Sequence, residues 1–94
     1  MKAVFTAAAL ADLDEILVYT AENCPSVTIR LEQRIRDVIA HIEERPLNAR
    51  MIHGRADMRV VPLIRYPYKI FYRITQDGIE ILHFHHTARK PWAE

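Results

Sequence analysis

The spacing of apolar residues changes once along this chain, and this change limits the possible folds more than any other feature. Between residues 7 and 45, apolar side chains recur every three or four positions, which is the period of an amphipathic helix. From Met58 onwards the chain is rich in β-branched and aromatic residues, which favour strands. The 94 residues leave room for one domain, spanning residues 1–94. The sequence therefore predicts a single α+β domain with its helices before most of its strands.

Two helices are predicted in the first half. Thr6 is an N-cap candidate, and a helix is expected after it at about residues 7–22. Pro25 suits the first turn of a second helix, which should end near Arg45 because Pro46 follows. Since the join is short, the two helices should form an antiparallel hairpin. Their apolar stripes consist of Leu10, Leu13, Ile16 and Leu17 in the first helix, and of Val27, Leu31, Ile35, Val38, Ile39 and Ile42 in the second.

Four strands are predicted in the remaining chain, at residues 2–5, 58–65, 68–75 and 79–86. A loop is expected over residues 46–57 and an irregular tail over residues 87–94. Asp77-Gly78 between the last two strands is a strong hairpin signal. The predicted order is β-α-α-β-β-β, with the helical hairpin packed on one face of a mainly antiparallel sheet.

The hairpin also predicts which side chains share a face. If Asp77 and Gly78 form the turn, Tyr72 lies opposite His83, and opposed residues point to the same side. The face expected to meet the helices then holds Tyr68, Ile70, Tyr72, Ile74, Ile79, Ile81, His83 and His85. The other face holds Lys69, Phe71, Arg73, Thr75, Glu80, Leu82, Phe84 and His86. Because this second face mixes apolar side chains with cations, it indicates a binding surface.

Composition excludes several classes of protein. Two glycines are too few for a Gly-rich nucleotide-binding loop. One cysteine, Cys24, rules out a disulfide framework and a multi-cysteine metal site, and a free thiol fits a reducing cytoplasm. No apolar run approaches the ~20 residues of a membrane span, and the N-terminus does not resemble a signal peptide. We expect a cytoplasmic protein without cofactor, metal or membrane segment.

Charge is unevenly distributed, although the formal net charge is only +1. Residues 1–44 carry eight acidic and four basic side chains, and residues 45–94 carry four acidic and nine basic ones. Ten of the thirteen cations are arginines, whose planar guanidinium group matches carboxylates and phosphates. Two interpretations stay open: acidic helices balanced by a basic sheet, or a basic face that binds a partner.

A histidine cluster, His83, His85 and His86, is the most conspicuous chemical feature. As a metal site it lacks a suitably placed acid or cysteine, so a structural role is favoured over metal binding. As a general acid or base, a histidine near cations suits metal-free RNA cleavage, which needs an acid, a base and cations on the phosphate. Lys69, Arg73 and His86 share a predicted face and are candidates for these roles.

Two further segments each have two interpretations. Residues 65–69 (RYPYK) interleave cations with aromatic rings, which suits nucleic-acid binding, whereas Pro67 favours a structural turn into the next strand. Trp92 would anchor either the C-terminal tail or a partner, and the former is favoured.

A family resemblance rests on three parts of the chain. Residues 11–16 (ADLDEI) with Tyr19 lie in the first predicted helix, and Arg45-Pro46 follows the second. The most specific parts are residues 65–74 (RYPYKIFYRI) and the stretch ILHFHHTAR that ends at Arg89. On these residues the chain resembles the RelE/ParE superfamily of type II toxin–antitoxin toxins, nearer to the ParE branch. The predicted element order agrees with the fold of that superfamily.

The resemblance implies a small bacterial toxin, of the kind linked to plasmid stabilisation, that is neutralised by a ParD-like antitoxin in a hetero-oligomer. ParE-like members are associated with poisoning DNA gyrase, and RelE-like members cut mRNA in the ribosome. Since the branches share a fold, the fold does not decide between them. Thr87 and Ala88 stand where one nuclease subgroup carries its catalytic pair, whereas Arg89 resembles the ParE ending.

Three hypotheses follow. The first is a non-catalytic toxin that binds gyrase, with contacts assigned to Arg65, Lys69, Phe71, Arg73, Phe84, His86, Arg89 and Trp92. The second is a ribosome-dependent endoribonuclease, in which His85 or His86 acts as acid or base while Lys69 and Arg73 hold the phosphate. The third is an inactive family member retained for complex formation and regulation of its own operon.

Overall fold

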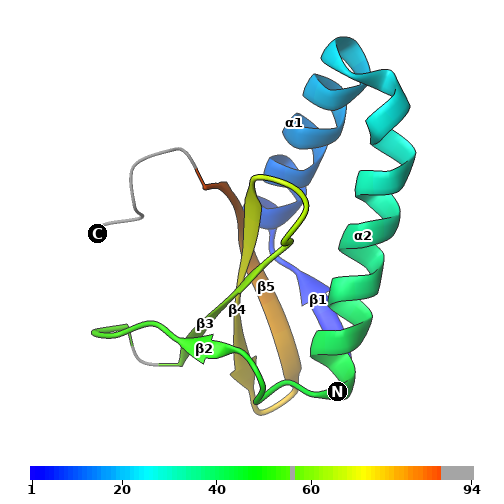
Figure 1. Ribbon diagram of the computed structural model, residues 1–94. Coiled ribbons are helices and arrows are strands. Elements are labelled where there is room, and N and C mark those ends of the chain that lie inside the picture. The colour runs from blue at the N-terminus through cyan, green and yellow to red at the C-terminus, as the bar shows by residue number, and fades with distance from the viewer. Residues whose placement is uncertain (56, 88–94) are drawn as a thin grey trace.

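The computed structural model describes residues 1–55 and 57–87, and its architecture is the predicted α+β arrangement of a helical hairpin on a sheet (Figure 1). Helices α1 and α2 lie side by side and cover one face of a five-stranded sheet. The strand order is β1-β5-β4-β3-β2, in which β1 runs parallel to β5 and the other neighbours are antiparallel. The elements are β1 (Ala3–Phe5), α1 (Ala7–Asn23), α2 (Pro25–Glu44), β2 (Arg50–Met51), β3 (Met58–Pro62), β4 (Tyr68–Thr75) and β5 (Gly78–His86).

The helix boundaries follow the expected signals. The hydroxyl of Thr6 accepts a hydrogen bond from the backbone N–H of Ala9 at 3.1 Å, which caps α1. Pro25 occupies the first turn of α2, where its missing N–H costs nothing. The N–H of Arg45 closes the end of α2 on the carbonyl of His41 at 2.8 Å. Both helices therefore begin and end within about one residue of the sequence prediction.

One strand was missed by the sequence analysis. β2 has only two residues, Arg50 and Met51, which pair with Val60 and Arg59 of β3. A two-residue strand cannot show an alternating pattern, so this segment was expected to be part of a loop. Arg59 reinforces the pairing by donating to the carbonyl of Ala49 at 2.8 Å.

The core lies between the helices and the sheet. From α2 it receives Leu31, Ile35, Val38 and Ile42, and from the sheet mainly Ile70, Tyr72, Ile79, Ile81 and Phe84. The ring of Tyr72 is fully buried, and its hydroxyl donates to the carbonyl of Pro46 at 2.6 Å. Burial raises the pKa of Tyr72, although the nearby Arg59 opposes this shift. The neutral phenol thus ties the loop after α2 to the middle of the sheet.

The β4–β5 register differs from the predicted one in two respects. Thr75 pairs with Gly78, so the turn consists of Gln76 and Asp77 rather than of Asp77 and Gly78. A β-bulge then inserts one extra residue, Leu82, into β5, between the pairs Tyr72–Ile81 and Phe71–His83. The shift of the turn by itself moves no residue to the other face, because the pairing changes by an even number of positions.

The bulge reverses the predicted faces for the last part of β5. His83 and His85 pair with Phe71 and Lys69, so they lie on the face away from the helices and not on the helix face. Phe84 and His86 lie on the helix face, opposite Ile70 and Tyr68, and not on the open face as predicted. The predicted faces of these residues were wrong because a single inserted residue moves every later side chain of the strand to the opposite face.

Candidate functional site

The sheet face that no helix covers is the open face, and it carries the candidate site. Its centre is apolar, since Val60 of β3 and Phe71 of β4 are only 6% and 5% exposed. The segment between β2 and β3 contributes Ile52 and Arg55 to a small groove of about 140 Å³ over these two residues. Arg50, Met58 and Lys69 complete the lining of this groove. The open face therefore carries cations around an apolar centre that is itself buried: Phe71, predicted to belong to an exposed apolar patch, is only 5% exposed, and Phe84 is not part of this face.

The polar groups around the apolar centre of this face are held by neighbouring side chains. Arg73 Nε lies 2.7 Å from Glu80 Oε1, an ion pair across β4 and β5. The Lys69 ammonium lies 5.9 Å from the centre of the Phe71 ring, and the edge of the His85 ring meets the same phenylalanine at 6.0 Å. These contacts hold the cations in place around an aromatic centre.

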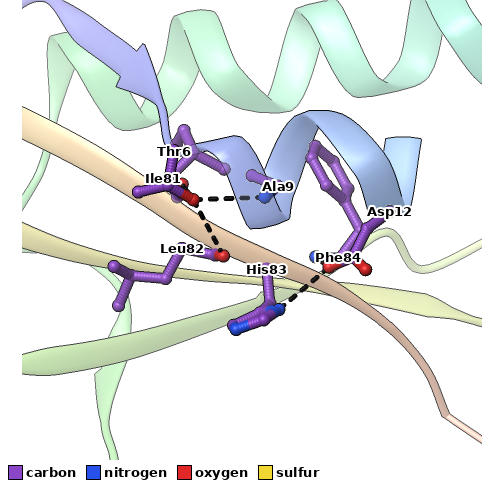
Figure 2. Close-up of polar contacts among 7 residues, drawn as sticks. All are labelled: Thr6, Ala9, Asp12, Ile81, Leu82, His83 and Phe84. Atoms are coloured by element: carbon purple, nitrogen blue, oxygen red, sulfur yellow. Dashed lines mark hydrogen bonds and ion pairs between the residues drawn. The ribbon is translucent and has the colours of Figure 1, made fainter. Parts of the chain in front are cut away.

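The bulge that brings His83 to this face is fixed by the first turns of α1 (Figure 2). The carboxylate of Asp12 accepts from the backbone N–H of Phe84 at 3.1 Å, and the same oxygen lies 3.0 Å from His83 Nδ1. The hydroxyl of Thr6 lies 3.0 and 3.1 Å from the carbonyl oxygens of Ile81 and Leu82. The side chains of Thr6, the N-cap of α1, and of Asp12 in α1 thus bond to backbone groups of β5 on both sides of the bulge.

This support was only partly visible in the sequence. Thr6 was expected as a helix cap, but its contacts with β5, 75 and 76 residues away, were not. Asp12 lies in the first predicted helix, and its side chain is only 29% exposed because it bonds to β5. Local sequence patterns do not predict contacts between residues so far apart in the chain. The one sequence signal that included Asp12 was the motif ADLDEI of the family resemblance.

The structure divides the predicted contact residues among three places. Lys69, Phe71 and Arg73 lie together on the open face, and His85 joins them. Arg65 is exposed in the loop between β3 and β4. Phe84 is in the core, where it stacks on Phe5 with 5.9 Å between ring centres, and His86 meets the edge of Tyr68 at 5.2 Å. Arg89 and Trp92 lie outside the described residues.

A larger groove of about 530 Å³ lies beside this face, between the end of α2 and the sheet. Its apolar lining includes Val60 and Val61, and its basic lining consists of His41, Arg45, Arg50 and Lys69. No acidic residue lines it within the described part of the chain. Positive charge therefore extends from the open face around the sheet edge towards α2.

The described residues form neither a metal-binding cluster nor a membrane-spanning helix. Among residues 1–55 and 57–87, no three histidine, cysteine, aspartate or glutamate side chains gather in a way that could hold a metal ion. None of the helices in this part of the chain is long and apolar enough to cross a membrane.

Comparison with protein families decides the assignment. The family model described as "ParE toxin of type II toxin-antitoxin system, parDE" matches residues 3–91. The chain belongs to this family. It is therefore a ParE-type toxin, nearer to the ParE branch than to the RelE branch of the superfamily, as the sequence motifs predicted. Membership in a toxin–antitoxin family implies an antitoxin partner.

Solved structures support the fold of this ParE-type toxin. A chain from "Chromosomal ParDE TA system from P. aeruginosa" superposes with a TM-score of 0.79 at 23% identity, covering 92% of this chain and 95% of that one. The isolated E. coli RelE toxin superposes with a TM-score of 0.59 at 15% identity, covering 95% and 86%. Comparison with curated proteins found no match.

Proposed function

We propose that this ParE-type toxin stops growth by binding and inhibiting DNA gyrase in the cytoplasm, and that a ParD-like antitoxin neutralises it in a hetero-oligomer. The observation that carries the proposal is the family match over residues 3–91, because ParE-like toxins are associated with gyrase. The fold by itself does not distinguish gyrase inhibition from RNA cleavage, because it also superposes on a RelE toxin.

The geometry of the open face supports binding rather than RNA cleavage. A metal-free nuclease needs an acid, a base and phosphate-binding cations around one reacting bond. His86 lies on the helix face, so it is separated from Lys69, Arg73 and His85 by the sheet. Arg73 is engaged by Glu80 at 2.7 Å, which reduces its use as a phosphate ligand. The nuclease set assigned from the sequence therefore does not converge on one point.

A binding role needs no such convergence. The open face offers the half-buried Ile52 and Met58 in a small groove, which Arg50, Arg55 and Lys69 also line above the buried Val60 and Phe71. This arrangement suits a protein surface whose apolar contact is bordered by carboxylates. We assign Arg65, Lys69 and Arg73 to the gyrase contact, together with Arg89 and Trp92 of the tail. Phe71 is buried and contributes by supporting Lys69.

A ribosome-dependent endoribonuclease is the second candidate, and one observation favours it. Asp12 lies 3.0 Å from His83 Nδ1, and a carboxylate in this position orients an imidazole for acid or base work. His83 and His85 share the open face with Lys69. In this account His83, oriented by Asp12, and His85 transfer the protons as the acid and base pair, and Lys69 stabilises the charge on the phosphate.

The deciding experiment uses toxin purified away from its antitoxin in two parallel reactions. Gyrase supercoiling of relaxed plasmid is titrated with toxin, and an equal titration is made of a reconstituted translation reaction whose mRNA is analysed for cuts. We expect supercoiling to fail while the mRNA stays intact. His85→Gln should inhibit gyrase like the wild type. Cut mRNA that is lost with His85→Gln, with gyrase unaffected, would establish the nuclease instead.

A further inference from the structure

The loop between β3 and β4 contains a residue that does not suit its backbone conformation. Ile64 has φ of 60°, in the left-handed region that β-branched residues avoid. The N–H of Arg65 donates to the carbonyl of Leu63 at 2.6 Å, which closes a three-residue turn centred on Ile64. With a positive φ at its centre, this is the rare and strained form of the γ-turn. Among the described residues, the other non-glycine with a positive φ is Asp57, a type that tolerates it.

Ile64 is also exposed. Its relative exposure is 77%, close to the 79% of Ile29 on the outer surface of α2. An exposed isoleucine gains little from burial, and a strained backbone adds a cost that glycine or asparagine would avoid. Strain of this kind persists only where the surrounding structure imposes it, and it gathers at functional sites.

The flanks of the turn are firmly held. Leu63 is fully buried, and its N–H donates to the carbonyl of Tyr68 at 2.9 Å. Arg34 of α2 donates to the carbonyl of Leu63 at 3.3 Å. On the other side, the N–H of Thr87 donates to the carbonyl of Pro67 at 2.8 Å. Because both ends are anchored, the loop presents Ile64 in one fixed orientation, which lowers the entropy lost on binding.

We propose that Ile64, together with the exposed Arg65, is an anchor that inserts into an apolar pocket bordered by carboxylates on the toxin's target protein. This inference rests on the proposed function, because it takes the target to be a protein. The pocket must be apolar because isoleucine offers no polar group. The border of this pocket is acidic in the proposal because Arg65 lies next to the anchor, and because Arg34 and His41 line the adjacent groove with one acidic residue, Asp37.

The neighbouring sheet edge favours an inserted side chain over an added strand. Ile64 rims a groove of about 460 Å³ between α2 and β3, lined also by Val38, Val61 and Pro62. Pro62 has no N–H to donate, so a partner strand finds no donor at this position of β3. The groove therefore gives the partner a surface to rest on, and Ile64 supplies the anchor.

The test compares three full-length variants with the wild type in five assays: thermal unfolding, half-inhibition of gyrase supercoiling, growth arrest on induction, affinity for the antitoxin, and affinity for duplex DNA. Ile64→Asn removes the apolar side chain and suits a positive φ, Ile64→Leu keeps an apolar side chain, and Ile29→Gln is the control at equal exposure. We expect Ile64→Asn to raise Tm by about 4 °C or more, and to weaken gyrase inhibition and growth arrest about tenfold or more. Ile64→Leu should stay within about threefold of the wild type, and Ile29→Gln should match it.

Several outcomes would overturn the proposal. If Ile64→Asn raises Tm but arrests growth and inhibits gyrase like the wild type, the loop carries strain without a binding role. A lower Tm for this variant would contradict the strain itself. An equal loss of affinity for the antitoxin would assign the anchor to that partner, and loss of binding to duplex DNA would assign it to nucleic acid.

The wild-type toxin distinguishes a failure of the gyrase proposal from a failure of the anchor proposal. If wild-type toxin leaves gyrase active but still arrests growth, the gyrase proposal is wrong and growth arrest alone decides the role of Ile64. In that case, loss of arrest with Ile64→Asn supports the anchor, and full arrest refutes it. A wild-type chain that neither inhibits gyrase nor arrests growth would overturn both proposals.

Discussion

Replacing Asp12 with alanine tests how the open face is built. The Asp12 carboxylate accepts from the backbone N–H of Phe84 at 3.1 Å and lies 3.0 Å from His83 Nδ1. Losing this hydrogen bond to a charged acceptor costs about 1.5–3 kcal/mol, because the Phe84 N–H loses the carboxylate to which it donates. We assign no further stabilising free energy to the pair of Asp12 and His83, because both side chains are about one-third exposed and solvent screens their interaction.

A matched control isolates this contact. Asp14 is exposed on the same helix, and Asp14→Ala gives the same gain in helix propensity of about 0.5 kcal/mol without removing a contact to β5. The free energy of unfolding, measured by urea titration, should therefore be about 1.5–3 kcal/mol lower for Asp12→Ala than for Asp14→Ala. For a domain of this size, Tm should differ by about 6–20 °C.

The bulge itself can be observed separately. In Asp12→Ala, amide hydrogen exchange should accelerate at Phe84 more than at residues of β4. Equal unfolding free energies for the two aspartate variants would refute the reasoning that α1 holds the bulge. So would a destabilised Asp12→Ala whose Phe84 amide exchanges at the wild-type rate.

Two further predictions concern residues of the core and the turn. Gly78→Ala should destabilise the fold by about 1–3 kcal/mol in urea titration, because a Cβ there would lie 2.7 Å from the carbonyl oxygen of Lys2; an unchanged midpoint would contradict this close approach. Tyr72→Phe should cost about 1 kcal/mol through the lost hydrogen bond to Pro46. Because burial raises the folded-state pKa of Tyr72 above about 10, its contribution to stability is present below that pH and lost as pH rises through the raised pKa. Wild-type stability should fall more steeply than that of Tyr72→Phe above about pH 10, and parallel curves would refute this account.

The sequence predicted the helices, the element order and the packing of the helices on one face, because these depend on local signals. The change of apolar period, Thr6 as a cap and Pro25 in a first turn act within a few residues. β2 was missed because two residues make no pattern.

The candidate site was only half predictable. Lys69, Phe71 and Arg73 were placed on the correct face because β4 is regular. Phe84 and His86 were placed on the wrong face because Leu82 forms a bulge. That bulge is held by α1 through contacts across more than 70 residues, which no turn or periodicity signal reports. The strain at Ile64 depends likewise on anchors distant in the chain.

Trapping of broken DNA decides whether gyrase is the target that we propose for this toxin. Purified toxin is incubated with gyrase, ATP and plasmid, the reaction is stopped with detergent and digested with protease, and linear DNA is quantified with and without the antitoxin. The account predicts loss of supercoiling together with linear DNA that rises with toxin concentration and disappears when antitoxin is added first. Unimpaired supercoiling and intact plasmid at toxin concentrations that cut mRNA on ribosomes would contradict it.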